Sequence, residues 1–405
     1  MKKLCAPAAY LARLTAFPDR RPGSPDNDAA VEIAAEALRE LGWQVRTPEF
    51  DITAWQGGQG RLERDGVTVP VRPSPYGCGT DTVATLVEAG DRAALAALAE
   101  DGRAAGQVLL VHGELSAWPL MPQDYPFYRQ PGDDEVRTLL MRCAPAALIA
   151  ATGRAPELAG AVDPFPFIED GRFPIPVADM RPEQLPQLLT WAGRPVRASL
   201  DGRRWAARAR NVVAGQVGEG TRLVVTAHID TKPGTPGALD NATGVVILLL
   251  LAARLDPCAP VELVAFNGED HFSAAGEVHY LSGLGGVDGP LEEVRLAVNI
   301  DGAGHRDGPT AWSAYNLDDA TLDRARAVLT QPGLVEGDQW WQSDHAIFAR
   351  RGRPAVAFTS ADLQRLLGEV VHTEHDTAEL VDIAALITVA DAIANLVAAL
   401  TPPAG

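Results

Sequence analysis

The chain has 405 residues, a formal net charge of −18, and apolar and charged fractions of 46% and 22%. This length and composition predict a globular protein of two or three domains with a sizeable core. The acidic balance argues against a nucleic-acid-binding protein, because phosphate contacts need clustered Lys and Arg. The same charge also keeps a protein soluble and indicates nothing about its fold.

Neither a membrane-spanning segment nor a disulfide framework is predicted. The longest uninterrupted apolar run, Val245–Ala253, is far shorter than the ~20 residues that a spanning helix needs. Residues 1–14 carry two lysines but lack the apolar core of a signal peptide, so we expect them to begin the first helix. These features favour a cytoplasmic protein with no membrane partner. The cysteines show no CxxC spacing and are expected to be reduced thiols: Cys5, Cys78, Cys143 and Cys258.

Residues 1–72 predict two helices followed by two strands. A Pro/Gly turn at 22–25 ends the first helix, and Asn27 or Asp28 can cap the next. Helical spacing of apolar residues predicts a helix over 30–41, which Gly42 stops. Strand-like sequence follows over 44–53 and 60–71.

Residues 73–207 differ in character and are interpreted as an inserted domain. A Pro-, Tyr- and Phe-rich loop at 118–134 has the length of functional or disordered loops. It could close over an active site as a lid, or simply pack on the surface. Strands are predicted over 107–111, 146–151 and 175–178, and helices over 135–142 and 181–192.

Residues 208–405 alternate regularly between strands and helices. Such alternation predicts a largely parallel sheet covered by helices on both faces. Ligands bind such sheets outside the carboxyl ends of the strands. The predicted strands are 222–227, 261–266, 294–300 and 354–358, and the predicted helices are 242–255, one ending at 281, 320–330 and 379–400.

Polar side chains follow three of these predicted strands. His228 and Asp230 come directly after the first, the adjacent Glu269 and Asp270 follow the second, and Asp301 ends the third. In His-x-Asp, the carboxylate can accept from one ring nitrogen and so fix the tautomer that binds a metal through the other. Taken alone, adjacent carboxylates in a loop are usually just solvated.

Asp240 and His372 complete the candidate set. Asp240 precedes a predicted helix and could simply be its N-cap, and His372 lies in HTEHDT after another break. Gathering these groups at one sheet edge would bury unpaired charge, and two divalent ions would remove that cost. We therefore expect a dinuclear metal site. Its ligands are His228, Asp240, Asp270, Asp301 and His372, with Glu269 left as a base.

Ordered motifs resemble the metallopeptidase family M28 of dinuclear zinc aminopeptidases: AHIDTKPG…GALDNATG, FNGED, NIDGAG, SDHAIFARRGRPAV and HTEHDT. GQVLLVHG, AALIAAT and IPVADM resemble the protease-associated (PA) domain. The resemblance covers nearly the whole chain. It implies the zinc exopeptidase fold, a three-layer α/β/α sandwich with a mostly parallel sheet, formed by 1–72 and 208–405. A β-rich PA domain at 73–207 is inserted into it.

The resemblance also implies how the ligands divide. His228 and Asp301 would hold one zinc, Asp270 and His372 the other, and Asp240 would bridge the two. Members often have glutamate where this chain has Asp270, so the shorter side chain could bind with one oxygen. Cobalt or manganese could replace zinc in vitro.

By the same resemblance Glu269 is the general base, and Asp230 supports His228. Two ions ~3.5–4 Å apart can clamp both the attacking and the departing oxygen, and zinc lowers the pKa of bound water towards ~7. Glu269 would take the proton of that water and pass it to the leaving amine. No serine or cysteine nucleophile is then required, and no GxSxG motif is present.

The leading expectation is an exopeptidase that removes N-terminal residues from peptides, as a monomer or small homo-oligomer. A carboxypeptidase or other amide hydrolase would use the same site. A glutaminyl cyclase, which uses one zinc, or an inactive binding protein fits less well with every ligand position filled. Trp340 and Trp341 either pack in the core or wall a pocket for an apolar side chain.

Overall fold

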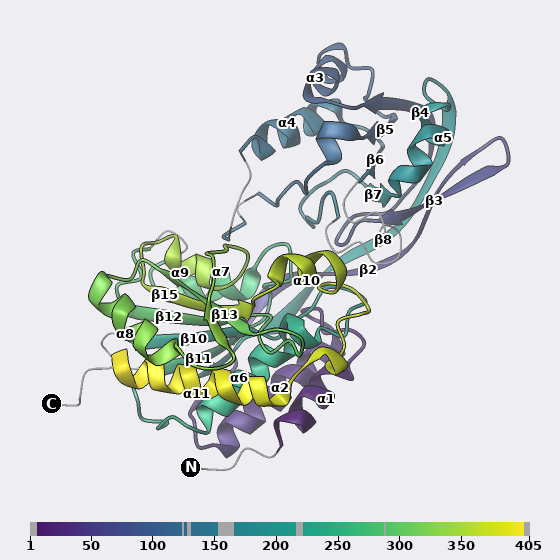
Figure 1. The fold of residues 1–405 in the computed structure, drawn as a ribbon. Helices are drawn as coiled ribbons and strands as arrows, with labels where there is room; N and C mark the ends of the chain where they lie inside the picture. Colours follow the sequence, from purple (N-terminus) through teal and green to yellow (C-terminus); the bar gives the residue numbers. More distant parts are fainter. Residues whose placement is uncertain are drawn as a thin grey trace. The chain divides into compact units, whose positions relative to one another are not determined.

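The computed structural model describes residues 6–123, 125–127, 131–152, 166–215, 222–286 and 289–400. The chain divides into two compact units (Figure 1). The first comprises Met1–Ile52, Pro126–Tyr128 and Arg208–Gly405, and the second comprises Thr53–Tyr125 and Arg129–Ala207. Each unit has its own sheet and its own apolar core.

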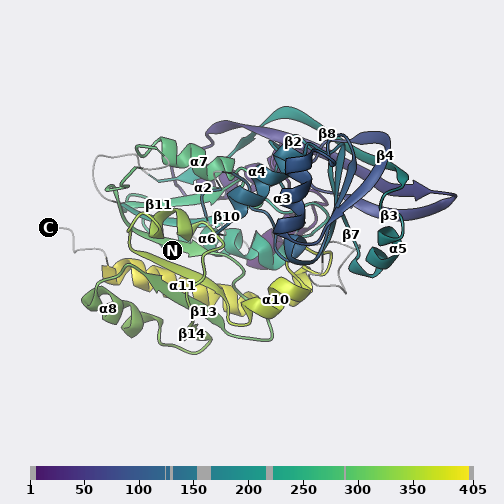
Figure 2. The ribbon, with the colours of Figure 1, turned by 90° about the horizontal axis from the view of Figure 1, so that it is seen from above.

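In the described residues, the first unit contains an eight-stranded mixed sheet in the order β1-β9-β11-β10-β12-β15-β13-β14. The neighbours β11, β10, β12 and β15 are parallel, whereas β9 and β13 pair with them in antiparallel fashion. Figure 2 shows β13 and β14 at one edge. The strands are β1 Val45–Arg46, β9 Val212–Ala214, β10 Arg222–His228, β11 Val261–Phe266, β12 Val294–Ile300, β13 Thr310–Tyr315, β14 Leu334–Glu336 and β15 Ala355–Ser360.

The four parallel strands are those that the sequence predicts, which confirms the α/β fold class. The sequence does not predict β9, β13 or β14. Two of these have three residues each, too few to show a period-2 pattern. The third reads TAWSAY, in which Ala and Ser are weak strand formers.

Helices cover both faces of this sheet and make a three-layer α/β/α sandwich (Figure 1). Helix α6 packs on α11 and against β10, and α11 also contacts α8. On the other face α9 packs against β12 and β15, with α7 beside it. The helices are α1 Pro7–Thr15, α2 Pro25–Glu40, α6 Thr243–Ala252, α7 Ala275–Ser282, α8 Asp319–Leu329, α9 His345–Ala349, α10 Leu363–Glu369 and α11 Ile383–Leu400, with short turns η3 Ala238–Ala242 and η4 Ala378–Leu380.

Helix α11 is long and apolar enough to cross a membrane by length and composition, with a mean hydropathy of 2.1. It also places eight of its residues in the core, among them Leu386, Ile393 and Leu396. Core helices of globular proteins meet the same criterion. Its packing against α6 and α8 accounts for its apolar composition.

The start of α2 differs in detail from the sequence prediction. Ser24, rather than Asn27 or Asp28, is the N-cap: its side chain accepts from the Asn27 N–H at 3.0 Å. Pro25 occupies the first helical position, where its missing N–H costs nothing. The Asn27 side chain is therefore available for contacts elsewhere.

The second unit is a closed barrel in the order β2-β3-β7-β6-β5-β4-β8. Neighbouring strands from β4 through β5 and β6 to β7 are parallel, and β3 closes onto β7 in antiparallel fashion. The strands are β2 Glu49–Arg64, β3 Val67–Pro73, β4 Thr80–Ala89, β5 Val108–Val111, β6 Ala147–Ala151, β7 Val177–Met180 and β8 Pro195–Arg210. The same unit contains three helices and two short turns: α3 Arg92–Asp101, α4 Asp133–Cys143, α5 Leu185–Leu189, η1 Gly113–Ser116 and η2 Pro182–Gln184, counted among its described residues.

Residues 53–72, which the sequence analysis grouped with the peptidase-like part, lie in this barrel unit. The structural division falls after Ile52 and again after Ala207, whereas the sequence analysis placed these divisions after residues 72 and 207. The physical reason is strand pairing. Residues 60–64 of β2 pair with 67–71 of β3, and β3 in turn pairs with β7 inside the barrel.

The predicted lid loop at 118–134 is described only in part, because residues 124 and 128–130 lie outside the described residues. Within the described part, Leu120 is buried, and its N–H donates to the carbonyl of Phe167 in the same barrel unit at 2.7 Å. The lid therefore remains a prediction from the sequence. Among the described residues, Cys78, Cys143 and Cys258 form no disulfide bond with one another, and Cys5 lies outside the described residues.

Candidate metal centre

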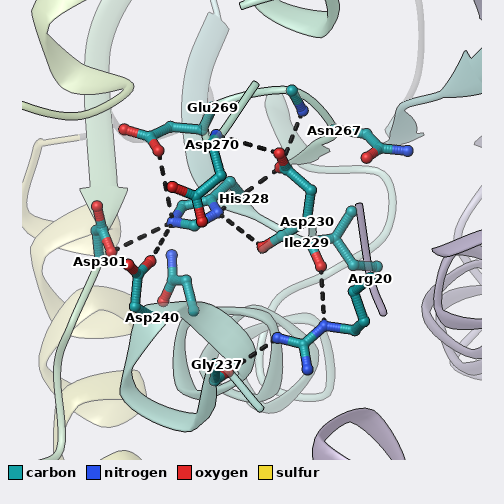
Figure 3. A network of polar contacts seen from close by, with 12 residues as sticks. Arg20, His228, Ile229, Asp230, Gly237, Asp240, Asn267, Glu269, Asp270 and Asp301 are labelled. Atoms are coloured by element: carbon teal, nitrogen blue, oxygen red, sulfur yellow. Dashed lines mark hydrogen bonds and ion pairs between the residues drawn. The ribbon is translucent and has the colours of Figure 1, made fainter. Parts of the chain in front are cut away.

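The six predicted side chains converge near the carboxyl ends of the parallel strands of the first unit. Figure 3 shows five of them, His228, Asp240, Glu269, Asp270 and Asp301. His228 is the last residue of β10 and Asp301 directly follows β12. Asp240 and His372 do not end strands: one lies in η3 before α6, and the other between α10 and η4. Glu269 and Asp270 follow β11 after a two-residue turn.

His228 is the centre of the first ligand group. Its Nε2 lies 2.9 Å from Oδ1 of Asp240 and 3.4 Å from Oδ1 of Asp301. Glu269 stands slightly further away, with 4.0 Å between its Oε2 and the same nitrogen. Figure 3 shows these three carboxylates turned towards the imidazole. This histidine is fully buried, so its carboxylate neighbours lie in a low-dielectric environment.

His372 is the centre of the second group. Its Nε2 lies 3.0 Å from Oδ2 of Asp240 and 3.1 Å from Oδ1 of Asp270. The two oxygens of Asp240 thus face two different histidines, Oδ1 towards His228 and Oδ2 towards His372. A carboxylate in this position can bridge two ions.

The donor set fits divalent metal ions. Three groups of ligand atoms lie within 4.8 Å of one another: His228, Asp240 and Asp301; Asp240, Asp270 and His372; and His228, Glu269 and Asp270. The first two are the ligand sets that the M28 resemblance implies. Imidazole nitrogen and carboxylate oxygen are ordinary zinc ligands. One of these atoms, Oδ2 of Asp270, is buried without a hydrogen bond, as expected of an atom that binds a metal.

Both histidines hold protons tightly in the metal-free protein. Burial alone would lower the pKa of His372, but the carboxylates beside it raise that pKa to about 10. The pKa of His228 is also raised well above its ordinary value, because Asp301 and Glu269 outweigh the opposing effect of burial. Both imidazoles are therefore charged at neutral pH until a cation displaces the proton.

Glu269 differs from an ordinary surface carboxylate. Burial raises its pKa well above the usual range, and the negative charges of Asp270 and Asp301 raise it further against the opposing effect of His228. A buried carboxylate with a raised pKa is a stronger proton acceptor than a solvated one. Its position beside the ligands suits a general base.

Asp230 supports the site differently from the sequence prediction. The Nδ1 atom of His228 lies 3.3 Å from the backbone carbonyl of Asp230 and 3.7 Å from its carboxylate. The carboxylate instead accepts the N–H groups of Gly268 at 2.9 Å and Asp270 at 3.1 Å. Asp230 therefore orients His228 through its backbone and holds the Glu269–Asp270 loop through its side chain.

Asn241, and not Asp240, provides the side chain that accepts a backbone N–H at the start of α6. Oδ1 of Asn241 accepts the N–H of Gly244 at 3.0 Å, while its amide donates to the carbonyl of Ile300 at 2.8 Å. The Asp240 side chain is thus left to face the histidines. Its backbone is held by Asp376, whose carboxylate accepts the N–H of Asp240 at 3.0 Å.

Three further residues contact the ligand loops, and the sequence analysis missed their roles. Asp376 also accepts the Leu239 N–H at 2.7 Å, and burial raises its pKa to about 7. Arg20 is fully buried and donates to the backbone carbonyl of Ile229 at 3.2 Å (Figure 3). Asn27 donates to Asn267 at 2.9 Å, in the loop that carries Glu269. No local pattern signals these contacts, because their partners are more than 100 residues distant in the chain.

The Trp340–Trp341 segment packs on Tyr315 and His345. The carbonyl of Trp340 accepts from the Tyr315 hydroxyl and from Nε2 of His345 at 2.7 Å. Burial lowers the pKa of His345 to about 4, so this imidazole is neutral at pH 7. The Trp341 ring meets the Tyr315 ring edge-on at 5.0 Å. Trp340 and Trp341 therefore pack against Tyr315 and His345, and their role in lining a substrate pocket stays a prediction.

An α/β/α sandwich with histidine and carboxylate ligands at the carboxyl ends of its parallel strands defines a protein of the zinc exopeptidase fold. Residues 211–397 match the model of peptidase family M28. This segment of the chain is therefore similar to the family.

Its relatives include a probable lipoprotein aminopeptidase of Mycobacterium tuberculosis (strain ATCC 25618 / H37Rv), 28% identical over 293 residues. The match covers 70% of this chain and 54% of the relative, so it spans about half of that protein's length. An aminopeptidase from Aneurinibacillus sp. strain AM-1 is similar in structure, with a TM-score of 0.71, 20% identity, and coverage of 96% of this chain and 92% of that one. A zinc aminopeptidase from Bacillus subtilis gives a TM-score of 0.70 at 19% identity, covering 96% and 93%. At these identities the structural likeness shows the fold alone.

Proposed function

We propose that the protein is an aminopeptidase that depends on two zinc ions. The position of Asp240 between His228 and His372 carries this proposal, since one carboxylate facing two histidines is what a bridged pair of ions requires. Asp301 completes the ligand set beside His228, and Asp270 completes the set beside His372. The names of the relatives support a peptidase that acts at the amino terminus.

The ions, when bound, would lower the pKa of a water molecule and polarise the scissile carbonyl. Glu269 takes up the proton of the attacking water and delivers it to the leaving amine, so that the proton count balances over one hydrolysis. Its raised pKa suits both steps. Asp230 keeps this base in place by holding the backbone on both sides of it, at Gly268 and Asp270.

A substrate panel with metal analysis tests this function. The purified protein should contain about two zinc ions per chain and cleave aminoacyl p-nitroanilides, and N-acetylation of the substrates should abolish cleavage. Cleavage of free and blocked substrates at equal rates would favour another amide hydrolase. Cleavage from the carboxyl end of a peptide, followed by mass spectrometry, would favour a carboxypeptidase.

We also infer that the barrel unit is the protease-associated domain whose motifs the sequence carries. Its closed barrel, its parallel strands β4 to β7 and its two apolar clusters support a separately stable body. Residues 53–207 expressed alone should therefore unfold cooperatively. A chain that stays unstructured by circular dichroism would contradict that inference.

A further inference from the structure

Arg20 is a buried cation whose guanidinium binds backbone carbonyls. Its side chain is 1% exposed. Its Nε donates to Ile229 at 3.2 Å, Nη1 to Leu14 at 2.8 Å and Pro236 at 2.6 Å, and Nη2 to Gly237 at 2.8 Å. Four of the five N–H groups of the guanidinium are thus used on the protein backbone.

The carbonyls belong to the segments that carry two metal ligands. Ile229 is the residue after His228, and Gly237 opens the turn that contains Asp240. The fork of Arg20 therefore ties these two segments together. Gly237 has a φ of 58°, and a Cβ there would collide with Thr231, with the Asp240 carbonyl and with the guanidinium itself. The absence of a side chain at Gly237 thus leaves room for the guanidinium of Arg20 close to the turn.

Asn27, in the first turn of α2, extends the same contact to the loop of the base. Its amide donates to the Arg20 carbonyl at 2.8 Å and to Oδ1 of Asn267 at 2.9 Å. The Asn267 amide donates back to Oδ1 of Asn27 at 2.8 Å, and Asn267 lies two residues before Glu269. Residues 20–27 therefore contact the loops of a base and two ligands.

We propose that Arg20 is a positioning residue of the metal centre, which holds the His228 and Asp240 segments at the spacing that two ions require. This inference rests on the proposed function, because it concerns the same two-metal site. It also places part of the centre outside residues 211–397, the segment that matches the family model. The chain from 211 onwards then lacks a contact that the ligands need.

Charge and geometry predict opposite effects of removing Arg20. The guanidinium lies among the carboxylates of Asp376, Asp240 and Asp230, where a fixed positive charge repels an incoming cation. If Arg20 acted through charge alone, its removal would tighten zinc binding. If it acts through its hydrogen bonds, removal weakens zinc binding. Lysine keeps the charge but lacks the planar fork, so it separates the two effects.

The experiment compares zinc binding by the full-length protein and by Arg20→Gln and Arg20→Lys. Metal-free protein is titrated with zinc against a chromogenic chelator, and the visible spectrum of the cobalt-loaded protein reports ligand geometry. Arg39→Gln is the control, since Arg39 is 46% exposed and pairs with Glu32 at 3.8 Å. We expect both Arg20 variants to bind zinc about 10- to 100-fold more weakly, with an altered cobalt spectrum, and the control to match the natural protein.

Circular dichroism and thermal unfolding of the metal-free variants show whether each is folded. If Arg20→Gln does not fold, the comparison rests on Arg20→Lys, which keeps the buried charge. Unchanged zinc affinity and an unchanged cobalt spectrum in a folded Arg20→Lys would overturn the proposal, as would tighter binding by a folded Arg20→Gln. Failure of the natural protein itself to bind zinc would instead reject the proposed function.

Discussion

The two units both contain parallel strands, but they differ in whether the buried polar groups near those strands have hydrogen-bond partners. In the barrel, Asp179 of β7 is buried, and its carboxylate accepts from the Ser74 hydroxyl at 3.0 Å and the Phe167 N–H at 2.9 Å. In the sandwich, Oδ2 of Asp270 is buried without a hydrogen bond. The carboxylate of Asp179 thus has hydrogen-bond donors within its own unit, whereas this oxygen of Asp270 has none.

The carboxyl ends of parallel strands therefore do not make a ligand-binding site by themselves. A buried polar group without a partner costs free energy, and a fold retains such groups where a ligand completes them. The histidine and carboxylate donors that cluster around Asp240 could hold a metal ion, so the ligand that they favour is a cation. Four experiments test this difference between the two units.

Removal of metal should have the largest effect. A strong chelator should abolish peptidase activity, and added zinc should restore it, because the ions supply the Lewis acidity of the reaction. Zinc at 1,000 times its Kd should also stabilise the folded state by about 4 kcal/mol. Hydrogen exchange should show the added protection in the ligand segments, such as 228–240, and none in the barrel. Equal protection of both units would contradict the assignment of the site to the sandwich.

Replacement of the base should come next. Glu269→Gln keeps the size of the side chain but removes the proton acceptor, so kcat should fall about 10²- to 10⁴-fold. Zinc content, measured by mass spectrometry of the metal, should stay near that of the natural protein. A variant that lost zinc in proportion to activity would make Glu269 a ligand, as the grouping with His228 and Asp270 allows.

Zinc binding should release protons and strengthen with pH. The pKa of His372 is raised to about 10 and that of His228 is also raised, so zinc must displace protons at neutral pH. For His372, the stabilisation of the metal-free fold is complete below its ordinary pKa of 6.5 and is lost as pH rises towards about 10. Titration calorimetry in buffers of different ionisation enthalpy measures the release, and a binding enthalpy independent of buffer would contradict it.

The smallest effect should follow a change in the barrel. Asp179→Ala leaves the Ser74 hydroxyl and the Phe167 N–H without their partner, at a cost of about 1–3 kcal/mol in unfolding free energy. Denaturant unfolding measures this loss. Zinc content and kcat for a small aminoacyl substrate should not change. A loss of bound zinc in a folded Asp179→Ala would show that the two units do not divide stability and chemistry as proposed.

The parallel strands and the residue types of the candidate ligands could be predicted from the sequence alone. Buried parallel strands read as largely apolar runs, so β11 and β12 agree with their predicted bounds to the residue, although Glu262 interrupts the first run and Arg295 and Asn299 the second. The ligand types were legible for a related reason. A histidine or carboxylate that directly ends such a run, as His228 and Asp301 do, stands out against the apolar residues before it.

The hydrogen bonds that hold these candidate ligands in place are seen only in the tertiary structure. The roles of Asp240 and Asn241 were ambiguous along the chain, because either residue type can cap a helix. In the structure the Asn241 side chain accepts the Gly244 N–H at the start of α6, and the Asp240 side chain faces the two histidines. Arg20 contacts Ile229 across 209 residues, and Asn27 contacts Asn267 across 240. Bonds such as that of Arg20 to a backbone carbonyl require no particular side chain at the acceptor, so they leave no pattern in the sequence, and the fold alone reveals them.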